Sequence, residues 1–362
     1  MKDQRIVAYA QLLVEHSMAV RPGDKVLIRG DLAAAPLMEE VARFVWRAGG
    51  FPHVWPSWEG LQRIRFSEAS DEQLAAVSDI DKLLMTGFDC MAAIHAPENT
   101  RALTGIDVRK QTIAARAVQP YSEHLVNHVR WVTCNYPSHA LAHDADMPLD
   151  AYADFLFGAC LIDWKQTEAA MQAVKAAFDA GTTVRIVGPD TDLTFSIAGR
   201  LGTVCAGEKN MPDGEVFYAP VEDSAEGFIT YDFPAIYQGH EVEGVRLEFR
   251  QGQVVQASAR KGEAFLLKLL DTDPGARRLG EFGIGCNFGI QRFSRDILFD
   301  EKIGGTVHLA LGRSYDESGG VNDSAIHWDM IKDLRRAARL ELDGRIVQEN
   351  GSFHGIFTET VK

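Results

Sequence analysis

The chain has 362 residues, of which 46% are hydrophobic and 24% charged, a composition typical of a folded globular protein rather than a disordered one. Its 51 acidic residues against 37 basic ones give a net charge of −14, which argues against nucleic acid as a partner because such binding needs a basic surface. No stretch approaches the roughly 18 uninterrupted apolar residues of a membrane span, so we expect no membrane partner.

Strand and helix patterns alternate through the first third of the chain. The predicted elements are, in order, a strand within residues 20–31, a helix at 36–50, a strand at 52–58, a helix around 71–77 and a strand at 81–87. This alternation predicts an α/β domain with a largely parallel sheet. No Gly-x-Gly-x-x-Gly or Walker-type loop follows the first strand, so the domain is Rossmann-like in layout without a nucleotide signature.

A long helix is predicted from residue 164, with Asp163 as its N-cap and Gly181 as its stop. Beyond it, alternating or β-branched runs are joined by turn signals such as the Asp-Gly pair at 343–344. These runs predict a β-rich α+β region that carries a few helices. We therefore expect two domains, an N-terminal α/β domain of residues 1–163 and a C-terminal metal-binding domain of residues 164–362.

Two histidines in the N-terminal region have the spacing of a zinc-binding helix. His124 and His128 are four residues apart, so a helix would place them on one face. The intervening residues lack the His-Glu-x-x-His pattern and no third ligand is evident. A polar helix face is the better interpretation.

The cysteines and the N-terminus favour a cytoplasmic location. The five cysteines are odd in number, far apart and without Cys-x-x-Cys pairing, so a disulfide framework is not expected and a reducing compartment fits. The first residues carry scattered charges and no apolar signal core.

Six side chains that can bind metal lie in short segments of the second half, and they are Glu215, Glu281, His308, Tyr315, His327 and Asp329. Around the last two, apolar residues alternate with His327 and Asp329, so a strand would place both on one face. The same alternation surrounds His308, and Ala310 leaves space beside it. The set exceeds what one closed zinc site needs and matches two metals that share an oxygen, which predicts metal-assisted hydrolysis.

At these residues the chain resembles the aminopeptidase T and aminopeptidase S metallo-aminopeptidases. The resemblance begins at LLVEHSMAVRPGDKVLIRG and runs through AYADFLFGACLID and NMPDGEVFYAPVEDSAEGFITYD to the His-Trp-Asp segment, so it covers nearly the whole chain. The metal ligands of that family fall on the six residues named above, each with the expected residue type. The resemblance implies hydrolysis of the N-terminal residue of short peptides with a free N-terminus. It also implies two divalent metal ions per chain (zinc, cobalt, manganese or magnesium) and a homodimer.

The residue types suggest a role for each member of the set. Glu215 and Glu281 suit a shared position because a carboxylate has two oxygens, whereas each histidine binds one ion through a single nitrogen. Tyr315 is either a phenolate ligand or a phenol that donates to an oxyanion, and it is one of two catalytic candidates. Asp329 ligates a metal or orients a histidine. The second catalytic candidate is Glu222, which is acidic, near Glu215 in sequence and surplus to the ligand set.

Two alternatives stay open at this point. The same scaffold resembles mononuclear iron ring-cleaving dioxygenases such as 2,5-dihydroxypyridine dioxygenase, in which a histidine matches the position of Glu281. Here that position is a glutamate and Glu215 is also present, and both departures favour the hydrolase. A non-catalytic binding protein is the other alternative, but it would be expected to have lost ligands.

Overall fold

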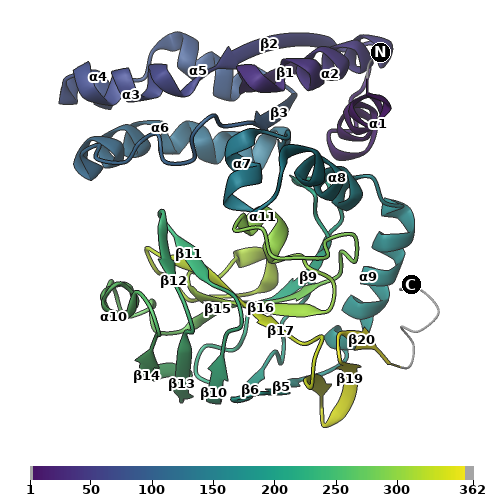
Figure 1. Ribbon diagram of the computed structural model, residues 1–362, viewed down its shortest axis with the longest axis vertical. Helices are drawn as coiled ribbons and strands as arrows, with labels where there is room; N and C mark the ends of the chain where they lie inside the picture. The colour runs from purple at the N-terminus through teal and green to yellow at the C-terminus, as the bar shows by residue number, and fades with distance from the viewer. Residues whose placement is uncertain (1–2, 355–362) are drawn as a thin grey trace. The chain divides into compact units, whose positions relative to one another are not determined.

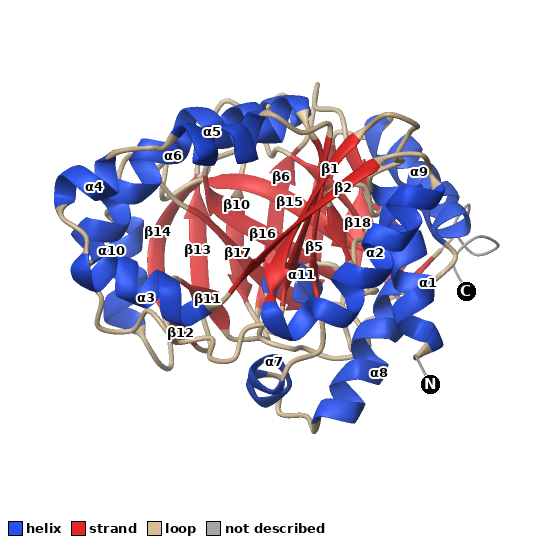
Figure 2. Ribbon diagram, turned by 90° about the horizontal axis from the view of Figure 1, so that it is seen from above, coloured by secondary structure: helices blue, strands red, loops and turns tan. Residues whose placement is uncertain are grey.

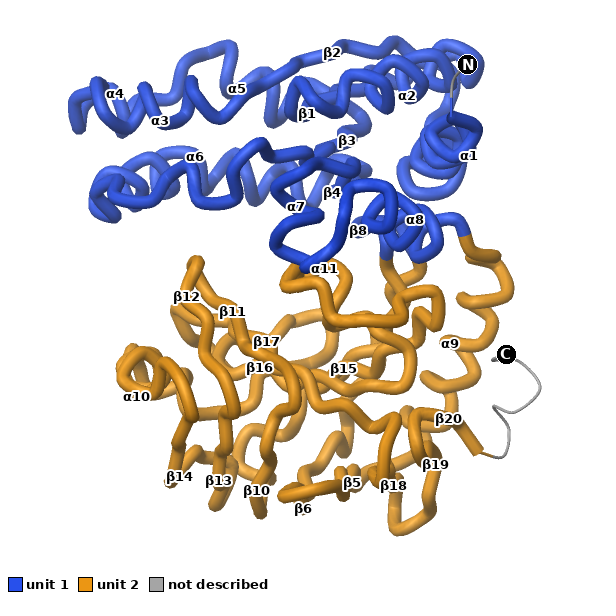
Figure 3. Tube along the Cα trace, viewed as in Figure 1, with its two compact units in different colours: residues 1–161, 207–212 blue, residues 162–206, 213–362 orange. Residues whose placement is uncertain are grey.

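The computed structural model describes residues 3–354, and the chain divides into two compact units (Figures 1 and 3). Unit 1 comprises Met1–Leu161 and Gly207–Pro212, and unit 2 comprises Ile162–Ala206 and Asp213–Lys362. Gly207–Pro212 belongs to unit 1 although it follows the start of unit 2 in the sequence, and a single boundary near residue 163 does not describe this return of the chain. The assignment of residues 1–163 and 164–362 as domains therefore remains a prediction.

Unit 1 is built on a five-stranded sheet in which all neighbouring strands are parallel. Its strands, in the spatial order β2-β1-β3-β4-β8, are β2 (Phe51–Ser57), β1 (Lys25–Asp31), β3 (Cys90–His95), β4 (Arg130–Asn135) and β8 (Asn210–Met211). The centre of β1 is fully buried at Val26, Leu27 and Ile28, as expected for a strand of a parallel sheet covered on both faces. The predicted parallel α/β layout is confirmed.

The helices of unit 1 flank this sheet (Figure 2). They are α1 (Gln4–Leu12), the π-helical turn Leu13–Ser17, the 3-10 turn Leu32–Ala34, α2 (Ala35–Arg47), α3 (Glu59–Glu68), α4 (Asp71–Ala75), α5 (Asp79–Thr86), α6 (Val108–His128), α7 (His139–Asp144) and α8 (Leu149–Cys160). In α2, Leu37, Val41 and Val45 are fully buried, which is the apolar face of an amphipathic helix.

The strand predicted at 81–87 is wrong, because these residues belong to α5. Ser78 caps that helix, and its side chain and that of Asp81 form a reciprocal capping box. The capping box specifies a helix start, whereas the short apolar run after it is compatible with either structure. The strand follows instead at β3.

Unit 2 contains an eight-stranded sheet in which neighbouring strands are antiparallel. Its strands, in spatial order, are β14 (Gln253–Ser258), β13 (Arg246–Arg250), β10 (Glu226–Thr230), β6 (Thr191–Ser196), β5 (Thr183–Gly188), β18 (Arg339–Leu342), β19 (Arg345–Glu349) and β20 (Ser352–Phe353). The predicted Asp-Gly turn joins β18 to β19, with φ of 49° at Asp343 and 78° at Gly344, both in the left-handed region that such a turn requires.

A second, five-stranded antiparallel sheet carries the residues singled out from the sequence. Its strands, in spatial order, are β17 (His327–Asp333), β16 (Thr306–Gly312), β15 (Leu279–Gly285), β9 (Glu215–Tyr218) and β7 (Thr203–Cys205). The remaining elements of unit 2 are α9 (Trp164–Asp179), the hairpin β11 (Ala235–Tyr237) and β12 (His240–Val242), α10 (Glu263–Leu270), α11 (Ile297–Asp300) and the 3-10 turn Asp316–Ser318. The predicted β-rich α+β unit is confirmed.

The core of unit 2 lies against one face of this second sheet. The ring of Phe282 on β15 meets Phe195 of β6 edge-on at 5.0 Å and lies 6.2 Å from Phe178 of α9. Because successive side chains of a strand point to opposite faces, Glu281 and Gly283 point away from this aromatic core. The opposite face of the sheet is the one that carries polar side chains.

Among residues 3–354, the search for a membrane-crossing segment finds no helix of sufficient length and apolarity.

Candidate metal centre

Strand register places five of the six predicted metal ligands on one face of the second sheet of unit 2. Glu281 lies opposite Ala310, and Ala310 lies opposite Asp329 on the next strand. His308 is two residues from Ala310 and His327 is two residues from Asp329, so the period of two directs all of them to the same face. Glu215 begins β9 and pairs with Gly285 on the other side of β15.

A glycine makes room for one imidazole. Gly283 lies opposite His308, and a Cβ atom at Gly283 would come within 2.0 Å of Cε1 and Nε2 of the His308 ring. That approach is far shorter than any real van der Waals contact. The imidazole therefore lies over the backbone of β15 only because no side chain stands there.

Glu281 lies between the two imidazoles and presents one oxygen to each. Its Oε1 is 3.2 Å from Nε2 of His308, and its Oε2 is 3.3 Å from Nε2 of His327. Nε2 of His308 is also 3.5 Å from Glu215 Oε2, and Nε2 of His327 is 3.5 Å from Asp329 Oδ2. A carboxylate placed in this way can be shared between two cations.

Backbone carbonyls fix the orientation of both rings. Nδ1 of His308 lies 3.0 Å from the carbonyl oxygen of Glu301, and Nδ1 of His327 lies 2.8 Å from that of Arg313. A carbonyl oxygen only accepts, so each Nδ1 carries the hydrogen and each Nε2 is turned toward the carboxylates. This is the arrangement in which histidine presents Nε2 to a metal ion.

Two buried carboxylate oxygens have no hydrogen-bond partner within the part of the chain that the structure describes. They are Oε2 of Glu215, a residue that is only 6% exposed, and Oδ1 of Asp329. A buried carboxylate oxygen without a donor is costly, and a cation removes that cost. The donor set of carboxylates and imidazoles suits a divalent metal, so the residues present fit such an ion.

Among the described residues, potential ligand atoms gather in three groups within unit 2, and two of these groups contain a histidine. The His308 group is Glu215, Glu301 and His308, and the His327 group is Glu281, His327 and Asp329. Within each group one potential ligand atom of every residue lies within 4.8 Å of the others. The structure thus brings five of the six predicted residues together and adds Glu301.

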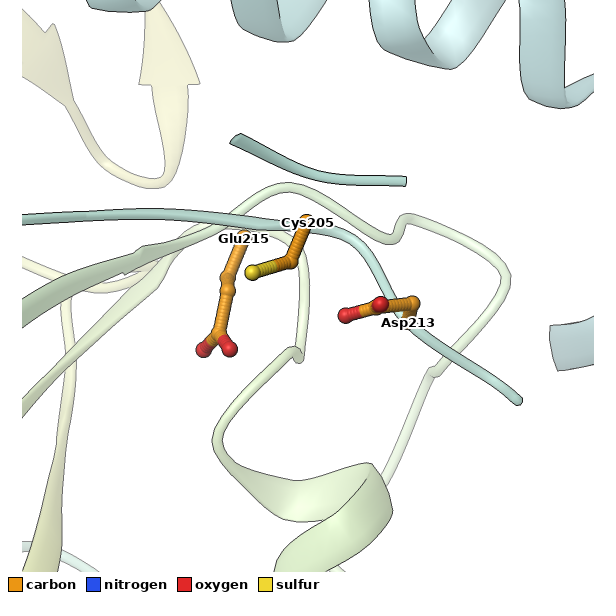
Figure 4. Close-up of side chains that lie close together, drawn as sticks. All are labelled: Cys205, Asp213 and Glu215. Carbon is orange, nitrogen blue, oxygen red and sulfur yellow. The ribbon is translucent and has the colours of Figure 1, made fainter. Parts of the chain in front are cut away.

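A third group, formed by Cys205, Asp213 and Glu215, shares one carboxylate with the His308 group. Figure 4 shows the thiol of Cys205 directed toward Glu215. Burial raises the pKa of the Cys205 thiol well above its ordinary value, and the neighbouring carboxylates act in the same direction. The thiol therefore keeps its proton near neutral pH in the metal-free chain.

The charged groups of the site perturb one another strongly. Burial raises the pKa of Glu215 to about 8. Burial by itself lowers the pKa of a histidine, but the carboxylates of Glu281 and Glu215 outweigh it and raise the pKa of His308 to about 10. Burial also acts to raise the pKa of Asp329, yet His327 lowers it to about 2. Metal binding to such groups releases protons, since a metal needs the deprotonated ligand.

Tyr315 lies at the edge of the site, just beyond β16. Its ring centroid is 5.1 Å from that of His327 and 5.6 Å from that of Phe217, and its side chain is 44% exposed. Burial of the phenol raises the pKa of Tyr315 well above its ordinary value. In the metal-free chain the phenol thus keeps its proton near neutral pH and can donate a hydrogen bond.

The structure gives Glu222 other partners. Its Oε2 is 2.7 Å from the Arg200 guanidinium, and its Oε1 accepts the backbone N–H of Val321 at 3.0 Å. These contacts anchor the segment between Tyr315 and His327. The proposed contact of Glu222 with the site remains a prediction.

Glu301 and Lys302 are the members of the site that sequence reasoning missed. They follow the four-residue helix α11, and the FDEKIGG segment has no periodicity that separates a functional turn from a solvated charged one. Lys302 is fully buried, and its Nζ lies 3.3 Å from Glu215 Oε1 and also contacts the carboxylate of Glu301. A buried lysine in a turn leaves no signal in a single sequence.

His124 and His128 lie together on α6 of unit 1, with ring centroids 4.7 Å apart. In the described part of the chain, neither belongs to any group of three potential metal ligands.

Comparison with known proteins supplies the family context. Residues 2–353 match the profile of a family described as thermophilic metalloprotease (M29). The chain is 29% identical to "Aminopeptidase 2" of Geobacillus stearothermophilus, over 98% of this chain and 97% of the relative. It is also 29% identical to "Aminopeptidase T" of Thermus thermophilus, over 89% and 90% of the two chains. The solved structure of wild-type AmpT from Thermus thermophilus matches with a TM-score of 0.83 over 97% of this chain and 99% of that one, at 24% identity, and this likeness supports the fold.

Proposed function

The chain belongs to the thermophilic metalloprotease family (M29), and from this membership we propose that it is a metal-dependent aminopeptidase that removes the N-terminal residue of short peptides. The observation that carries the proposal is the position of Glu281, which presents one oxygen to each of two imidazoles. Both imidazoles are oriented by a backbone carbonyl at Nδ1, so each ring can present Nε2 to a cation.

We propose two divalent ions per chain, with zinc, cobalt, manganese and magnesium all compatible with oxygen and nitrogen ligands. Glu215 and His308 would hold one ion, His327 and Asp329 the other, and Glu281 both. Glu215 and Asp329 each have one oxygen without a hydrogen-bond partner among the described residues, and each of these carboxylates lies beside a different imidazole, Glu215 beside His308 and Asp329 beside His327. This supports two ions rather than one. Tyr315 is the sixth candidate ligand.

Bound divalent ions polarise a scissile carbonyl and lower the pKa of a water molecule, which is the chemistry that peptide hydrolysis needs. The residues of the chain bind and orient the reactants. The protonated Tyr315 phenol can donate a hydrogen bond to the carbonyl oxygen as negative charge develops on it.

The alternative of a ring-cleaving iron dioxygenase is not supported. The relatives that match along nearly the whole chain carry the names of aminopeptidases. A dinuclear site with glutamates at 215 and 281 also differs from the two-histidine, one-carboxylate set of such oxygenases.

We further propose a cytoplasmic homodimer. All five cysteines are free, and four of them are buried, which suits a reducing compartment. The dimer rests on the resemblance to the aminopeptidase T and S enzymes, and size-exclusion chromatography with light scattering tests it.

The experiment that tests the function combines metal content and substrate choice. The protein is stripped of metal, reloaded with excess cobalt or zinc and desalted, and its metal is counted by elemental analysis. We expect two ions per chain, hydrolysis of peptides with a free N-terminus, and no hydrolysis of the same peptides after N-acetylation. One iron per chain together with oxygen uptake on dihydroxypyridines would contradict the proposal.

A further inference from the structure

A cavity of about 340 Å³ lies beside α9 in unit 2, and we call it the α9 cavity. Its floor is apolar, since Met171 and Val174 are fully buried and Cys286 is only 6% exposed. The residues that line it lie within 162–174 and 286–289, so all of them belong to unit 2. Cavities of this size with an apolar floor and few polar groups are typical of small-molecule sites.

The α9 cavity lies on the side of the five-stranded antiparallel sheet that faces away from the candidate metal ligands. The ring of Phe178 on α9 lies 6.2 Å from that of Phe282 on β15, so α9 covers the aromatic face of that strand. Cys286 directly follows β15 and is four residues after Phe282, so the alternation of side chains directs it to the same face. Glu281 points to the opposite face. A molecule in the cavity is therefore separated from the ligands by the backbone of the sheet.

The rim of the cavity is polar and carries a negative charge. Asp163 lines it at the N-cap of α9, where its Oδ1 accepts the N–H of Gln166 at 3.1 Å. Among the described residues that line the cavity, none is a lysine, arginine or histidine. The ring of Phe288, which is 37% exposed, also lines it. A carboxylate at the rim of an apolar floor complements a molecule with an apolar body and an ammonium group, and it repels a molecule with a carboxylate.

The wall formed by residues 286–289 is hydrogen-bonded to the turns that lead into the metal centre. The Cys286 N–H donates to the carbonyl of Gly214 at 2.8 Å, and Gly214 directly precedes Glu215. The Asn287 N–H donates to the carbonyl of Lys302 at 3.0 Å, and the Lys302 ammonium contacts the Glu215 carboxylate. A molecule that packs against Cys286 restricts the movement of this wall and of the backbone that carries Glu215. Ordering that is complete before an ion binds lowers the entropic cost of metal binding.

We propose that the α9 cavity is a regulatory site for a small primary amine with an apolar body, and that its occupation strengthens metal binding on the opposite face of the sheet. The apolar body lies against Met171, Val174 and Cys286, and the ammonium group lies beside Asp163. The binding site stands on the cavity itself, whereas its regulatory role rests on the proposed metal-dependent function.

The first experiment measures binding to the full, metal-free chain by isothermal titration calorimetry, with probes that share one aromatic ring and differ in charge. They are 2-phenylethylamine, 2-phenylethanol and phenylacetate, which are cationic, neutral and anionic near neutral pH. We expect the amine to bind with a Kd of about 1 mM or below, the alcohol to bind about fivefold more weakly and phenylacetate not to bind. Equal binding of amine and alcohol would overturn the assignment of an amine, and no binding of any probe would overturn the site.

Variants of α9 locate the probe. Ala170→Leu fills the cavity and is expected to abolish detectable binding, whereas Ala169→Leu makes the same change one position away, outside the cavity, and should bind normally. Asp163→Asn keeps an N-cap acceptor but removes the charge, so we expect the amine to bind only as tightly as the alcohol. Glu168→Gln is its matched control on the same helix. Because Asp163→Asn alters only the rim, it tests the site even if Ala170→Leu fails to fold.

A further variant separates the cavity from the carboxylates of the metal centre, which are a second place where an amine could bind. Glu281→Ala changes the metal centre and is expected to leave the binding of 2-phenylethylamine to the metal-free chain unchanged. Binding that survives Ala170→Leu and is lost in Glu281→Ala would place the amine at the metal centre and overturn the proposal.

The second experiment measures cobalt affinity by competition against a chromophoric chelator, with and without saturating 2-phenylethylamine. We expect the amine to tighten cobalt binding by about fivefold in the unchanged chain and to have no effect in Ala170→Leu. An equal effect in both chains, or none in either, would overturn the regulatory role. If the unchanged chain binds no metal, the proposed function fails together with the regulatory role, and the calorimetry still decides whether the cavity binds amines.

Discussion

Strands β1 and β3 of the parallel sheet in unit 1 and strands β15 and β16 of the antiparallel sheet in unit 2 are both largely buried, but the kinds of side chain that they bury differ. In β1 and β3 the buried side chains are apolar, such as Val26, Ile28 and Ile94. In β15 and β16 every residue is buried, yet one face carries Glu281 and His308. Apolar burial stabilises a sheet without outside help, whereas buried charges need partners. We therefore expect the stability of the second sheet to depend on bound cations more than that of the parallel sheet does.

The largest expected effect is at Glu281, which contacts both imidazoles. We expect Glu281→Ala to bind at most one ion and to lose peptidase activity by at least about 1,000-fold, because two ions lose a common ligand. Metal content, turnover of an aminoacyl-nitroanilide and circular dichroism measure this. His124→Ala in unit 1 is the control and should keep activity within about twofold. Normal turnover of Glu281→Ala would refute the ligand assignment.

We expect metal removal to destabilise the five-stranded antiparallel sheet of unit 2 more than the parallel sheet of unit 1. Ligands present at about 1,000 times their dissociation constant stabilise the folded state by about 4 kcal/mol. We expect chelation to lower the melting temperature by roughly 10 °C and to raise hydrogen exchange in β15, β16 and β17 while β1 and β3 stay protected. Mass-spectrometric hydrogen exchange checks this. An equal loss of protection in both sheets would contradict the expectation that metal stabilises the sheet of unit 2 more than the sheet of unit 1.

Two glycines, one in each unit, sharpen the comparison. Gly283→Ala places a methyl group where the ring of His308 lies, so we expect activity and metal affinity to fall by about 10- to 100-fold. Gly158 lies within α8 of unit 1 and a Cβ there would meet nothing within 4 Å. Gly158→Ala is expected to stabilise the protein by about 0.5–1 kcal/mol without a change in activity. Similar behaviour of the two variants would contradict the role of Gly283.

The smallest expected effect is a pH dependence in unit 1. Burial acts to raise the pKa of Asp24, but hydrogen bonds from the Arg21 N–H and the Arg130 guanidinium lower it overall. A lowered pKa contributes stability above the unfolded value of about 3.9, and this is lost as pH falls through the folded value. Asp24→Asn should lower the free energy of unfolding by about 1 kcal/mol at pH 7 and by less at pH 3, as measured with urea. An equal loss at both values would exclude the carboxylate as the cause.

The face on which each candidate ligand lies could be predicted from the sequence, because successive side chains of any strand point to opposite faces of the sheet. Trp328 and Met330 are buried on one side of β17, as is Ile326 just before it, and His327 and Asp329 point to the other side. Residues 81–87 were assigned wrongly because a short apolar run has no period of its own. There the capping box at Ser78 was the decisive signal.

The rest of the site could not be predicted because it depends on tertiary structure. Glu301 and Lys302 gain their significance from a turn that brings them against Glu215 and His308, which lie on other strands. Charged residues in turns are usually solvated, so local sequence favours that interpretation. The use of Glu222 to hold the segment at Val321 is equally a consequence of long-range packing.

The return of Gly207–Pro212 to unit 1 affects the order in which the two units can complete their folding during synthesis. Within unit 1, β8 pairs with β4, the Thr133 N–H donates to the carbonyl of Lys209, and the Tyr9 hydroxyl donates to the carbonyl of Met211. A polypeptide that ended at residue 163 would leave β4 as a bare edge open to pairing with other chains. Folding on the ribosome proceeds from the N-terminus, so the first unit is completed only after the start of the second has emerged.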